Sequence, residues 1–272
     1  MTASSRVAGL DLQSLRELNG LPPAVRDGLY ARLVPPALLD RCRIDPATGL
    51  GPDGYRMLRI VAPPEESWVR IEVRTSPYDR DPLLLIDLEM GAMAVPELAF
   101  VQITDPAAIR FDIDRDLDGS DTLFGTRGRN VPEEVRALAA GLAPGQVRRG
   151  LRLLGPVLDA TSEFCRLLGQ ELFLVEPLFY HSAWLYERHG CGYLMGRELM
   201  EEVQAGFQAG GHLLAALDDG SVFRPRGAEA SVRGRSWAIH DGILGDQSWG
   251  GVKMYRLADR AAGLATFPGG RY

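Results

Sequence analysis

An acidic stretch in the middle of the chain, FDIDRDLDGSDTLFG (residues 111–125), has the residue types and spacing of a calcium-binding loop. Asp114, Asp116 and Asp118 stand at its first, third and fifth positions, where carboxylates supply hard oxygen ligands, and a glycine follows at the sixth. The twelfth position, which normally holds a bidentate Glu, is Gly125. The stretch therefore predicts either a divalent-metal site or a solvated acidic turn, and the missing Glu favours the turn.

Four histidines could also ligate a metal, since neutral imidazole is a common metal ligand. They all lie in the last third of the chain: His181, His189, His212 and His240. On a helix, His181 and His189 would be about two turns apart, too far for a close pair of ligands. A site with two histidines and one carboxylate could be completed by Glu176, Glu187 or Asp241. A metal-dependent enzyme is therefore one alternative, and core or helix-terminal histidines are the other.

A third concentration of reactive side chains is the stretch VRGRSWAIHDGILGDQSWGG (232–251). Trp237, His240 and Trp249 lie there among glycines and arginines, which we interpret as a loop forming a pocket wall. Arginines of this stretch could clamp a carboxylate or phosphate. The tryptophans are equally compatible with core positions. This stretch leads to a further alternative, a non-catalytic protein that binds a small molecule.

The strongest functional pattern lies in residues 146–193. The run GQVRRGLRLLG (145–155) precedes an amphipathic stretch, the strand-like ELFLV and then SAWLYERHGCGY (182–193). In this order the segment resembles the GNAT superfamily of acyl-CoA-dependent N-acyltransferases. The resemblance implies a loop that opens a helix and holds the pyrophosphate of acetyl-CoA or another acyl-CoA through backbone N–H groups, with glycine allowing close approach. The matching positions are Gln146, Arg148, Arg149, Gly150 and Leu151.

The resemblance also implies a mechanism. A small amine attacks the thioester carbonyl, and a backbone N–H beside an edge strand polarises the carbonyl oxygen. Tyr186 occupies the position of the family's tyrosine, which protonates the departing thiolate. Glu176, at the end of the predicted strand, or His181 would deprotonate the amine. Two alternatives remain open: the segment is purely structural, and His181 is a buried, hydrogen-bonded core residue.

The elements that must position these residues follow from hydrophobic periodicity. Val69, Ile71 and Val73 alternate with charged residues, which predicts a half-exposed strand. With further strands expected at 55–61, 83–87 and 98–103, the block 55–115 is predicted to be a mostly antiparallel sheet.

Outside this block, we expect helices in the N-terminal part of the chain and a mixture of helices and strands in its second half. We expect short helices within 10–42, helices at 133–141, 180–189 and 196–217, and strands at 171–175, 231–239 and 252–255. The apolar stripe over 146–168 predicts helix that Pro156 kinks or divides. The predicted fold is α/β (α+β), a mostly antiparallel mixed sheet flanked by helices and GNAT-like. We divide it into an N-terminal helical extension (1–54) and a single α/β domain (55–272).

The composition of the chain limits the classes of molecule that it is expected to bind. The chain has 272 residues, 46% of them hydrophobic and 24% charged, as in ordinary globular proteins. A net charge of -6 argues against a nucleic-acid partner. We find no signal-peptide pattern, no apolar run long enough to span a membrane and no CxxC pair among the three cysteines. We therefore expect a cytoplasmic protein with a small-molecule substrate and no membrane partner, and a homodimer is compatible with the sequence.

Overall fold

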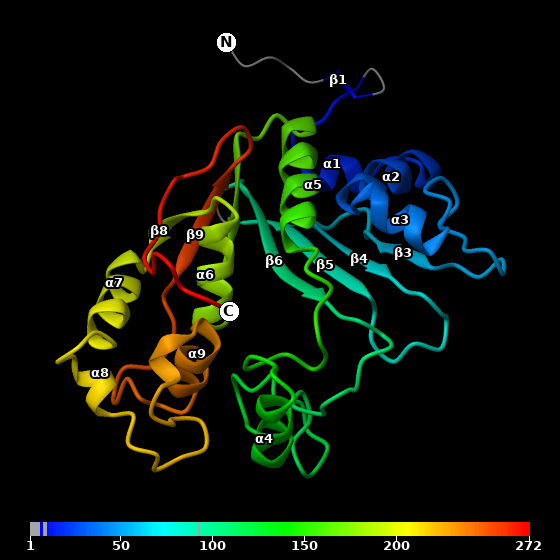
Figure 1. Cartoon of the computed structure of the whole chain (residues 1–272). Coiled ribbons are helices and arrows are strands. Elements are labelled where there is room, and N and C mark those ends of the chain that lie inside the picture. The colour runs from blue at the N-terminus through cyan, green and yellow to red at the C-terminus, as the bar shows by residue number, and fades with distance from the viewer. Residues whose placement is uncertain (1–5, 8–9, 92) are drawn as a thin grey trace. The chain divides into compact units, whose positions relative to one another are not determined.

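The computed structural model describes residues 6–7, 10–91 and 93–272 (Figure 1). The chain divides into two compact units, each built from three stretches. Unit 1 comprises Met1–Ala107, Gly150–Val175 and Tyr255–Ala261, and unit 2 comprises Ala108–Arg149, Glu176–Met254 and Ala262–Tyr272. The predicted boundary at residue 54, between a helical extension and an α/β domain, stays a prediction.

Unit 1 contains an antiparallel meander of four strands: β3 (Leu58–Val61), β4 (Trp68–Val73), β5 (Leu84–Met90) and β6 (Pro96–Ile103). Every second residue of β4 and β5 is fully buried, namely Val69, Ile71, Val73, Leu84, Ile86 and Leu88. This alternation is what the sequence pattern predicted, because successive side chains of a strand point to opposite faces. The four strands expected in the block 55–115 are thus confirmed.

The sheet continues beyond the meander with a parallel neighbour. β7 (Leu172–Val175) pairs with β6 in parallel, and the seven strands follow the order β3-β4-β5-β6-β7-β9-β8. The last two are β8 (Gly192–Met195) and β9 (Lys253–Leu257). The predicted fold class, a mixed sheet flanked by helices in an α+β arrangement, is confirmed. A separate two-stranded antiparallel sheet joins β1 (Arg6–Val7) and β2 (Leu10–Asp11).

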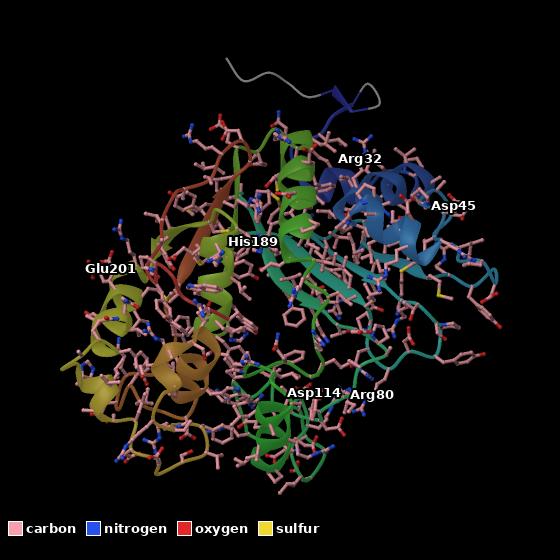
Figure 2. All side chains as sticks on the ribbon, in the orientation of Figure 1. Arg32, Asp45, Arg80, Asp114, His189 and Glu201 are labelled. Carbon is pink, nitrogen blue, oxygen red and sulfur yellow. The ribbon has the colours of Figure 1, made fainter. Side chains whose placement is uncertain are left out.

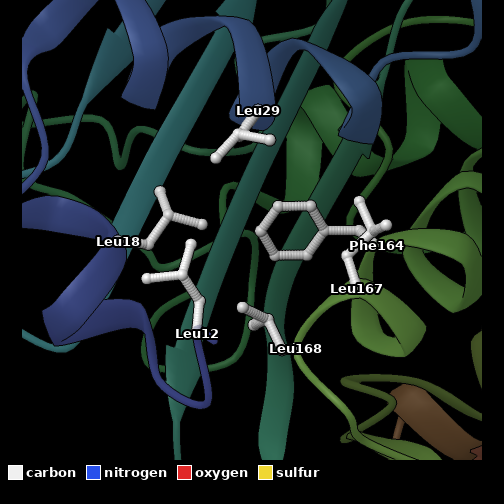
Figure 3. A pocket seen from close by; sticks show the side chains of 6 residues that line it. All are labelled: Leu12, Leu18, Leu29, Phe164, Leu167 and Leu168. Carbon is white, nitrogen blue, oxygen red and sulfur yellow. The ribbon is translucent and has the colours of Figure 1, made fainter. Parts of the chain in front are cut away.

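The helices of unit 1 are short near the N-terminus and longer before β7. They are α1 (Leu15–Asn19), α2 (Pro23–Tyr30), the 3-10 helix η1 (Ala31–Leu33), α3 (Pro36–Cys42) and α5 (Leu154–Leu167). The ring of Tyr30 stacks on Phe164 of α5 at a centroid distance of 5.6 Å. Figure 3 shows the small gap beside this contact, which is lined by Leu and Phe side chains and encloses only ≈ 10 Å³. With apolar walls and so little volume, the gap is a packing defect rather than a binding site.

The buried side-chain amide of Asn19 links α1 to the meander through hydrogen bonds. The Nδ2 of Asn19 donates hydrogen bonds to the carbonyl oxygens of Pro63, Glu66 and Trp68 at 3.0–3.1 Å. The hydroxyl of Tyr30 donates to its Oδ1. All polar atoms of this buried side chain are therefore satisfied, as stability requires.

Unit 2 is mainly helical. Its helices are α4 (Val131–Ala139), α6 (Tyr180–Arg188), α7 (Arg197–Gly206), α8 (His212–Ala215), the 3-10 helix η2 (Ala228–Ala230) and α9 (Val232–His240). A hydrophobic cluster beside α4 consists of Phe111, Ile113, Ala137, Leu142 and Val147. The expected helices at 133–141 and 180–189 correspond to α4 and α6.

Two expectations for unit 2 are wrong. The stretch 231–239, expected as a strand, is helix α9, because the Ser231 hydroxyl accepts a hydrogen bond from the N–H of Gly234 and caps a new helix. The helix expected over 196–217 is divided into α7 and α8. A Cβ on Gly211 would lie 2.2 Å from the carbonyl oxygen of Gly206, so the chain turns there in a way that only glycine permits.

The stripe over 146–168 becomes helix only in its second part. Gly145 and Arg152 have φ values of +78° and +58°, which interrupt a right-handed helix, and α5 begins at Leu154. Pro156 falls in the first turn, where its missing N–H costs no intrahelical hydrogen bond. Neither a kink nor a division at Pro156 occurs, since the helix begins just before it.

In the part of the chain that the structure describes, no helix combines the length and the apolar composition needed to cross a membrane.

Candidate functional site

The non-helical loop 150–153 directly precedes α5 and lies against the end of β6. A Cβ on Gly150 would lie 3.3 Å from the carbonyl oxygen of Ile103, the last residue of β6, so the loop and the strand end are in close contact. Arg152 has a left-handed backbone, and α5 then begins at Leu154 without a side-chain cap from any described residue. The first N–H groups of a helix lack intrahelical partners and attract anions. This loop can therefore receive a negatively charged group.

The strand that reaches this loop is irregular. Asp87 of β5 pairs with Phe100 of β6, whereas Leu88 pairs with Leu98, so Ala99 is an extra residue in β6. Such a bulge takes one residue out of the hydrogen-bond ladder and redirects the backbone. Ala99 is therefore the position where the pairing of β6 with β5 is irregular.

The parallel pairing beside this bulge is short. It joins Glu97 to Leu174 and Leu98 to Val175, and Val175 is the last residue of β7. β6 continues to Ile103. Beyond Leu98, no described strand pairs with β6 on its β7 side.

Three of the five predicted cofactor-binding residues lie in unit 2. The side-chain oxygen of Gln146 accepts a hydrogen bond from the N–H of Ala143 at 2.8 Å and thereby closes a local turn. Arg148 donates to the carbonyl oxygen of Ala108, and Arg149 is exposed. The side chains of Gln146 and Arg148 thus stabilise neighbouring backbone. Of the five, Gly150 and Leu151 form part of the loop before α5.

Tyr186, the predicted proton donor, is buried in α6 of unit 2. Burial raises the pKa of its phenol, and the nearby Cys191 adds to the effect. The hydroxyl therefore keeps its proton at neutral and mildly alkaline pH, as a proton donor must. His181 is five residues earlier on α6, so the two side chains leave the helix roughly 140° apart.

His181 is a buried, hydrogen-bonded residue, which is one of the alternatives that the sequence left open. Its Nδ1 lies 2.9 Å from the hydroxyl oxygen of Ser236 on α9, and its ring stacks on Phe179 at 5.7 Å. Burial lowers the pKa of His181 to about 3, with a further contribution from His240. The imidazole is therefore neutral at pH 7 and only weakly basic.

Glu176, the other predicted base, directly follows β7. Its carboxylate is largely exposed, and Oε2 lies 3.5 Å from the Nζ of Lys253. At this exposed position the carboxylate is accessible to an amine.

A buried charge network in unit 2 contains two residues that the sequence did not single out, Arg129 and Glu134. His240 Nε2 lies 2.9 Å from Glu134 Oε1, while Arg129 donates to Glu134 Oε2 at 2.6 and 2.8 Å. Asp241 extends the network through Arg129 at 3.1 Å and Arg224 at 3.0 Å. Burial opposes ionisation of Glu134, but the hydrogen bonds from His240 and Arg129 lower its pKa overall.

This network is a structural clamp between α4 and α9. A Cβ on Gly125 would lie 3.2 Å from Glu134 Oε1 and 3.3 Å from His240 Cε1, so the loop before α4 covers the pair closely. The only sequence signal for Glu134 is the acidic first turn of α4, which also suits the positive end of a helix. Nothing about that signal indicates a distant histidine partner.

The acidic stretch 111–125, in which Figure 2 labels Asp114, folds as turns stabilised by its own carboxylates and by the preceding Arg110. Arg110 pairs with Asp112 and, at 2.7 Å, with Asp114 Oδ2. The carboxylates of Asp116 and Asp118 accept backbone N–H groups of the same turn. The acidic-turn reading thus accounts for the conformation of the stretch.

Among the residues that the structure describes, no group of three or more His, Cys, Asp or Glu is arranged to hold a metal ion. The carboxylates considered as ligands have other partners. Glu187 accepts hydrogen bonds from the Tyr193 hydroxyl and the Thr266 N–H, and Asp241 belongs to the clamp. His189 lies at the C-terminal end of α6 (Figure 2).

The tryptophans of the stretch 232–251 have structural roles. Trp237 is fully buried, donates to the carbonyl oxygen of Leu142 at 2.8 Å and stacks on Phe223 at 5.0 Å. Trp249 donates to the carbonyl oxygen of Pro177 at 3.2 Å. The interpretation of this stretch as a loop is wrong for its first part, which is α9, and Trp237 is a core residue of that helix.

No family model, curated protein or solved structure matches this chain.

Proposed function

We propose that the chain is a GNAT-like, acyl-CoA-dependent N-acyltransferase that acts on a small amine. The observation that carries the proposal is the loop 150–153, which lies against the end of β6 and opens α5. A strand end, a glycine loop and an uncapped helix N-terminus together form a favourable place for a diphosphate.

The contact between the end of β6 and the loop 150–153 supports the resemblance. The sequence alone does not show this contact, because the two segments are far apart along the chain. Family members carry a strand directly before the glycine loop, whereas here residues 104–149, including α4, intervene. After this insertion, Gly150 lies next to Ile103, the last residue of β6. The strand of the motif is therefore β6, which lies next to the loop in space though far from it in sequence.

The second glycine position of the motif is occupied by Arg152. Its φ of +58° is the left-handed conformation that glycine favours, so the backbone makes the turn without glycine. Its side chain is exposed, and a guanidinium there adds positive charge beside the helix N-terminus.

β6 supports the placement of the thioester arm. Ala99, the bulge residue, is about 13 Å from Ile103 along the strand, from a rise of roughly 3.3 Å per residue. In the proposal the pantetheine arm follows the open edge of β6, and the Ala99 N–H donates to the thioester oxygen. Such a fixed donor stabilises the oxyanion that forms when the amine attacks.

On the resemblance alone, we propose that Tyr186 gives its proton to a departing CoA thiolate and that Glu176 removes a proton from the attacking amine. Glu176 suits the second role better than His181, whose pKa of about 3 makes it a weak base. We further propose a cytoplasmic location, where thiols such as those of the free Cys42, Cys165 and Cys191 stay reduced.

The test is an acetyl-transfer assay. The full chain is incubated with acetyl-CoA and a panel of primary amines, polyamines and amino acids, and free CoA thiol is measured over time. Amine-dependent release of CoA, with the N-acetyl product identified by mass spectrometry, is the expected result. CoA release at the same rate with and without every amine would contradict transfer and indicate simple thioester hydrolysis.

A further inference from the structure

A cavity of ≈ 320 Å³ lies in unit 1, at the end of the sheet where β4 and β6 finish. β4, β5 and β6 are neighbours in the sheet (Figure 1), and their register aligns Val73, Leu84 and Ile103. The residues that follow β4 and β6 therefore come together with the residue that precedes β5, because neighbouring strands of this meander are antiparallel. Three residues at these positions line the cavity: Thr75, Leu83 and Asp105.

Two further segments complete the lining. The C-terminal turn of α3 contributes Arg41 and Cys42, and the loop before α5 contributes Leu151. Leu83 is buried, whereas Arg41 and Ala107 are exposed, so the cavity is open to solvent on one side. Its volume lies at the lower end of the range for small-molecule sites. The cavity therefore has room for one small ligand.

Two opposite charges line the cavity without pairing with each other. They belong to Arg41 and Asp105, and among the described residues neither side chain has an ion-pair partner. Because the two charges do not neutralise each other, each can bind a group of opposite sign on a ligand. A ligand that carries both a carboxylate and an ammonium group matches this pair of charges.

The acceptors in the lining are held by the residues beside them. Asp105 Oδ1 accepts the N–H of Ala107 at 3.0 Å, which fixes the carboxylate just after β6. The hydroxyl of Thr75 donates to Asp79 Oδ2 at 2.7 Å and so offers its own oxygen as an acceptor. An ammonium group has three donors and no acceptor. The oxygens of Asp105 and Thr75 therefore suit a protonated amine better than an anion.

The rest of the lining is apolar. Leu83, Pro106 and Leu151 provide hydrocarbon surface. Burial raises the pKa of the Cys42 thiol, against a smaller opposite effect of Arg41, so this thiol is neutral and adds no charge to the lining. An aliphatic group of a ligand leaves water when it packs on this surface, which favours binding.

We infer that this cavity binds a free α-amino acid with an aliphatic side chain, such as L-leucine. Arg41 donates to its carboxylate, Asp105 and Thr75 accept from its ammonium group, and its side chain packs on Leu83 and Leu151. The inference goes beyond the proposed function and does not rest on it, because every contact comes from the cavity lining and none needs an acyl donor.

The test compares L-leucine, by calorimetric titration of the full chain, with two analogues that each lack one charge. Isopentylamine lacks the carboxylate, and 4-methylpentanoate lacks the ammonium group. We expect the wild type to bind L-leucine at least about tenfold more tightly than either analogue, since each analogue loses charged hydrogen bonds.

Two variants assign the charges to their partners. Arg41→Gln should weaken L-leucine and 4-methylpentanoate at least about tenfold and leave isopentylamine unchanged. Asp105→Asn, whose amide oxygen can still accept the Ala107 N–H, should weaken L-leucine and isopentylamine and leave 4-methylpentanoate unchanged. Arg43→Gln, exposed and outside the lining, is the matched control and should bind L-leucine like the wild type.

Three results overturn the amino-acid site. The first is absence of L-leucine binding to the folded wild type at millimolar concentration, and the second is equal affinity for L-leucine and both analogues. The third is L-leucine binding that neither Arg41→Gln nor Asp105→Asn weakens, in variants whose circular dichroism and melting temperature match the wild type. Acetyl transfer is measured in a separate assay, so each of these results leaves the acyltransferase proposal intact, and failure of that assay leaves the amino-acid site intact.

Discussion

At the level of single residues, the candidate catalytic groups differ most in their burial. Tyr186 and His181 are enclosed in unit 2, whereas Glu176 is solvated. Burial favours the neutral form of each group, which keeps Tyr186 protonated and His181 deprotonated. The sequence could identify these residues by the resemblance, but it could not show their exposure, because α6 carries no polar stripe that separates one face from the other.

Replacing Tyr186 with Phe removes the proposed proton donor and preserves the ring in the core. We expect kcat for amine acetylation to fall by roughly 10²-fold or more, with the affinity for acetyl-CoA unchanged. Because the pKa of Tyr186 is raised, the wild-type rate should not decline on the alkaline side below about pH 10, the ordinary pKa of tyrosine. Steady-state kinetics between pH 6 and 10 measure both effects. An unchanged kcat in Tyr186→Phe would remove the tyrosine from the mechanism.

His181 should make the folded state sensitive to mild acid. In the unfolded chain its pKa is about 6.5, and in the folded state it is about 3, so only the unfolded state takes up the proton between these values. The free energy of unfolding should therefore decrease as the pH falls below about 6.5, by about 2 kcal/mol at pH 5.

Urea unfolding at pH 8 and pH 5 measures this loss. His181→Asn, whose short amide can still face Ser236, should lose about 2 kcal/mol less than the wild type over the same interval. His212→Asn, at an exposed helix start, serves as the control and should behave like the wild type. Identical pH dependence in the wild type and His181→Asn would rule out His181 as the cause.

At the level of elements, the strands were predictable and the loop before α5 was not. Strand periodicity of two appears directly in residues 69–73, and it gave β4 nearly to the residue. The bulge at Ala99 and the contact between Gly150 and Ile103 depend on pairings between distant segments, which no local pattern encodes.

Substitution of Gly150 is the most direct test of whether the loop before α5 belongs to the binding site. We expect Gly150→Val to weaken acetyl-CoA binding at least about tenfold, because its side chain would press against the Ile103 carbonyl and move the loop away from the strand end. Gly28→Ala, on the exposed side of α2 with open space around the added methyl group, is the matched control and should bind normally. Calorimetric titration with acetyl-CoA provides the comparison, and equal affinities for both variants would show that the loop is not part of the site.

The assignment of Trp237 to the core of α9 predicts a stability effect. Trp237→Ala should lower the free energy of unfolding by about 3–5 kcal/mol, since it leaves a cavity and removes the hydrogen bond to Leu142. Trp249→Ala, at a half-buried position, should cost clearly less. Urea denaturation of both variants measures the difference. A loss of ligand binding without a loss of stability in Trp237→Ala would favour the pocket-wall interpretation instead.

At the level of the whole molecule, the fold class was predictable, but the division of the chain was not. Each compact unit consists of three separate stretches, and residues 108–149 interrupt the path from β6 to α5. Hydrophobic periodicity reports neighbours along the sequence and carries little information about such insertions. In the proposed acyltransferase, this insertion also separates β6 from the loop 150–153 along the sequence.

The central claim, that the loop before α5 binds the diphosphate of an acyl-CoA, is tested most directly by the thermal stability of the full chain with acetyl-CoA. At a ligand concentration of 100 times the dissociation constant, the free energy of unfolding should increase by roughly 2.7 kcal/mol. We therefore predict a melting temperature that rises by several degrees with acetyl-CoA and rises much less in Gly150→Val at the same concentration. An unchanged melting temperature of the folded wild type at millimolar acetyl-CoA would contradict the account.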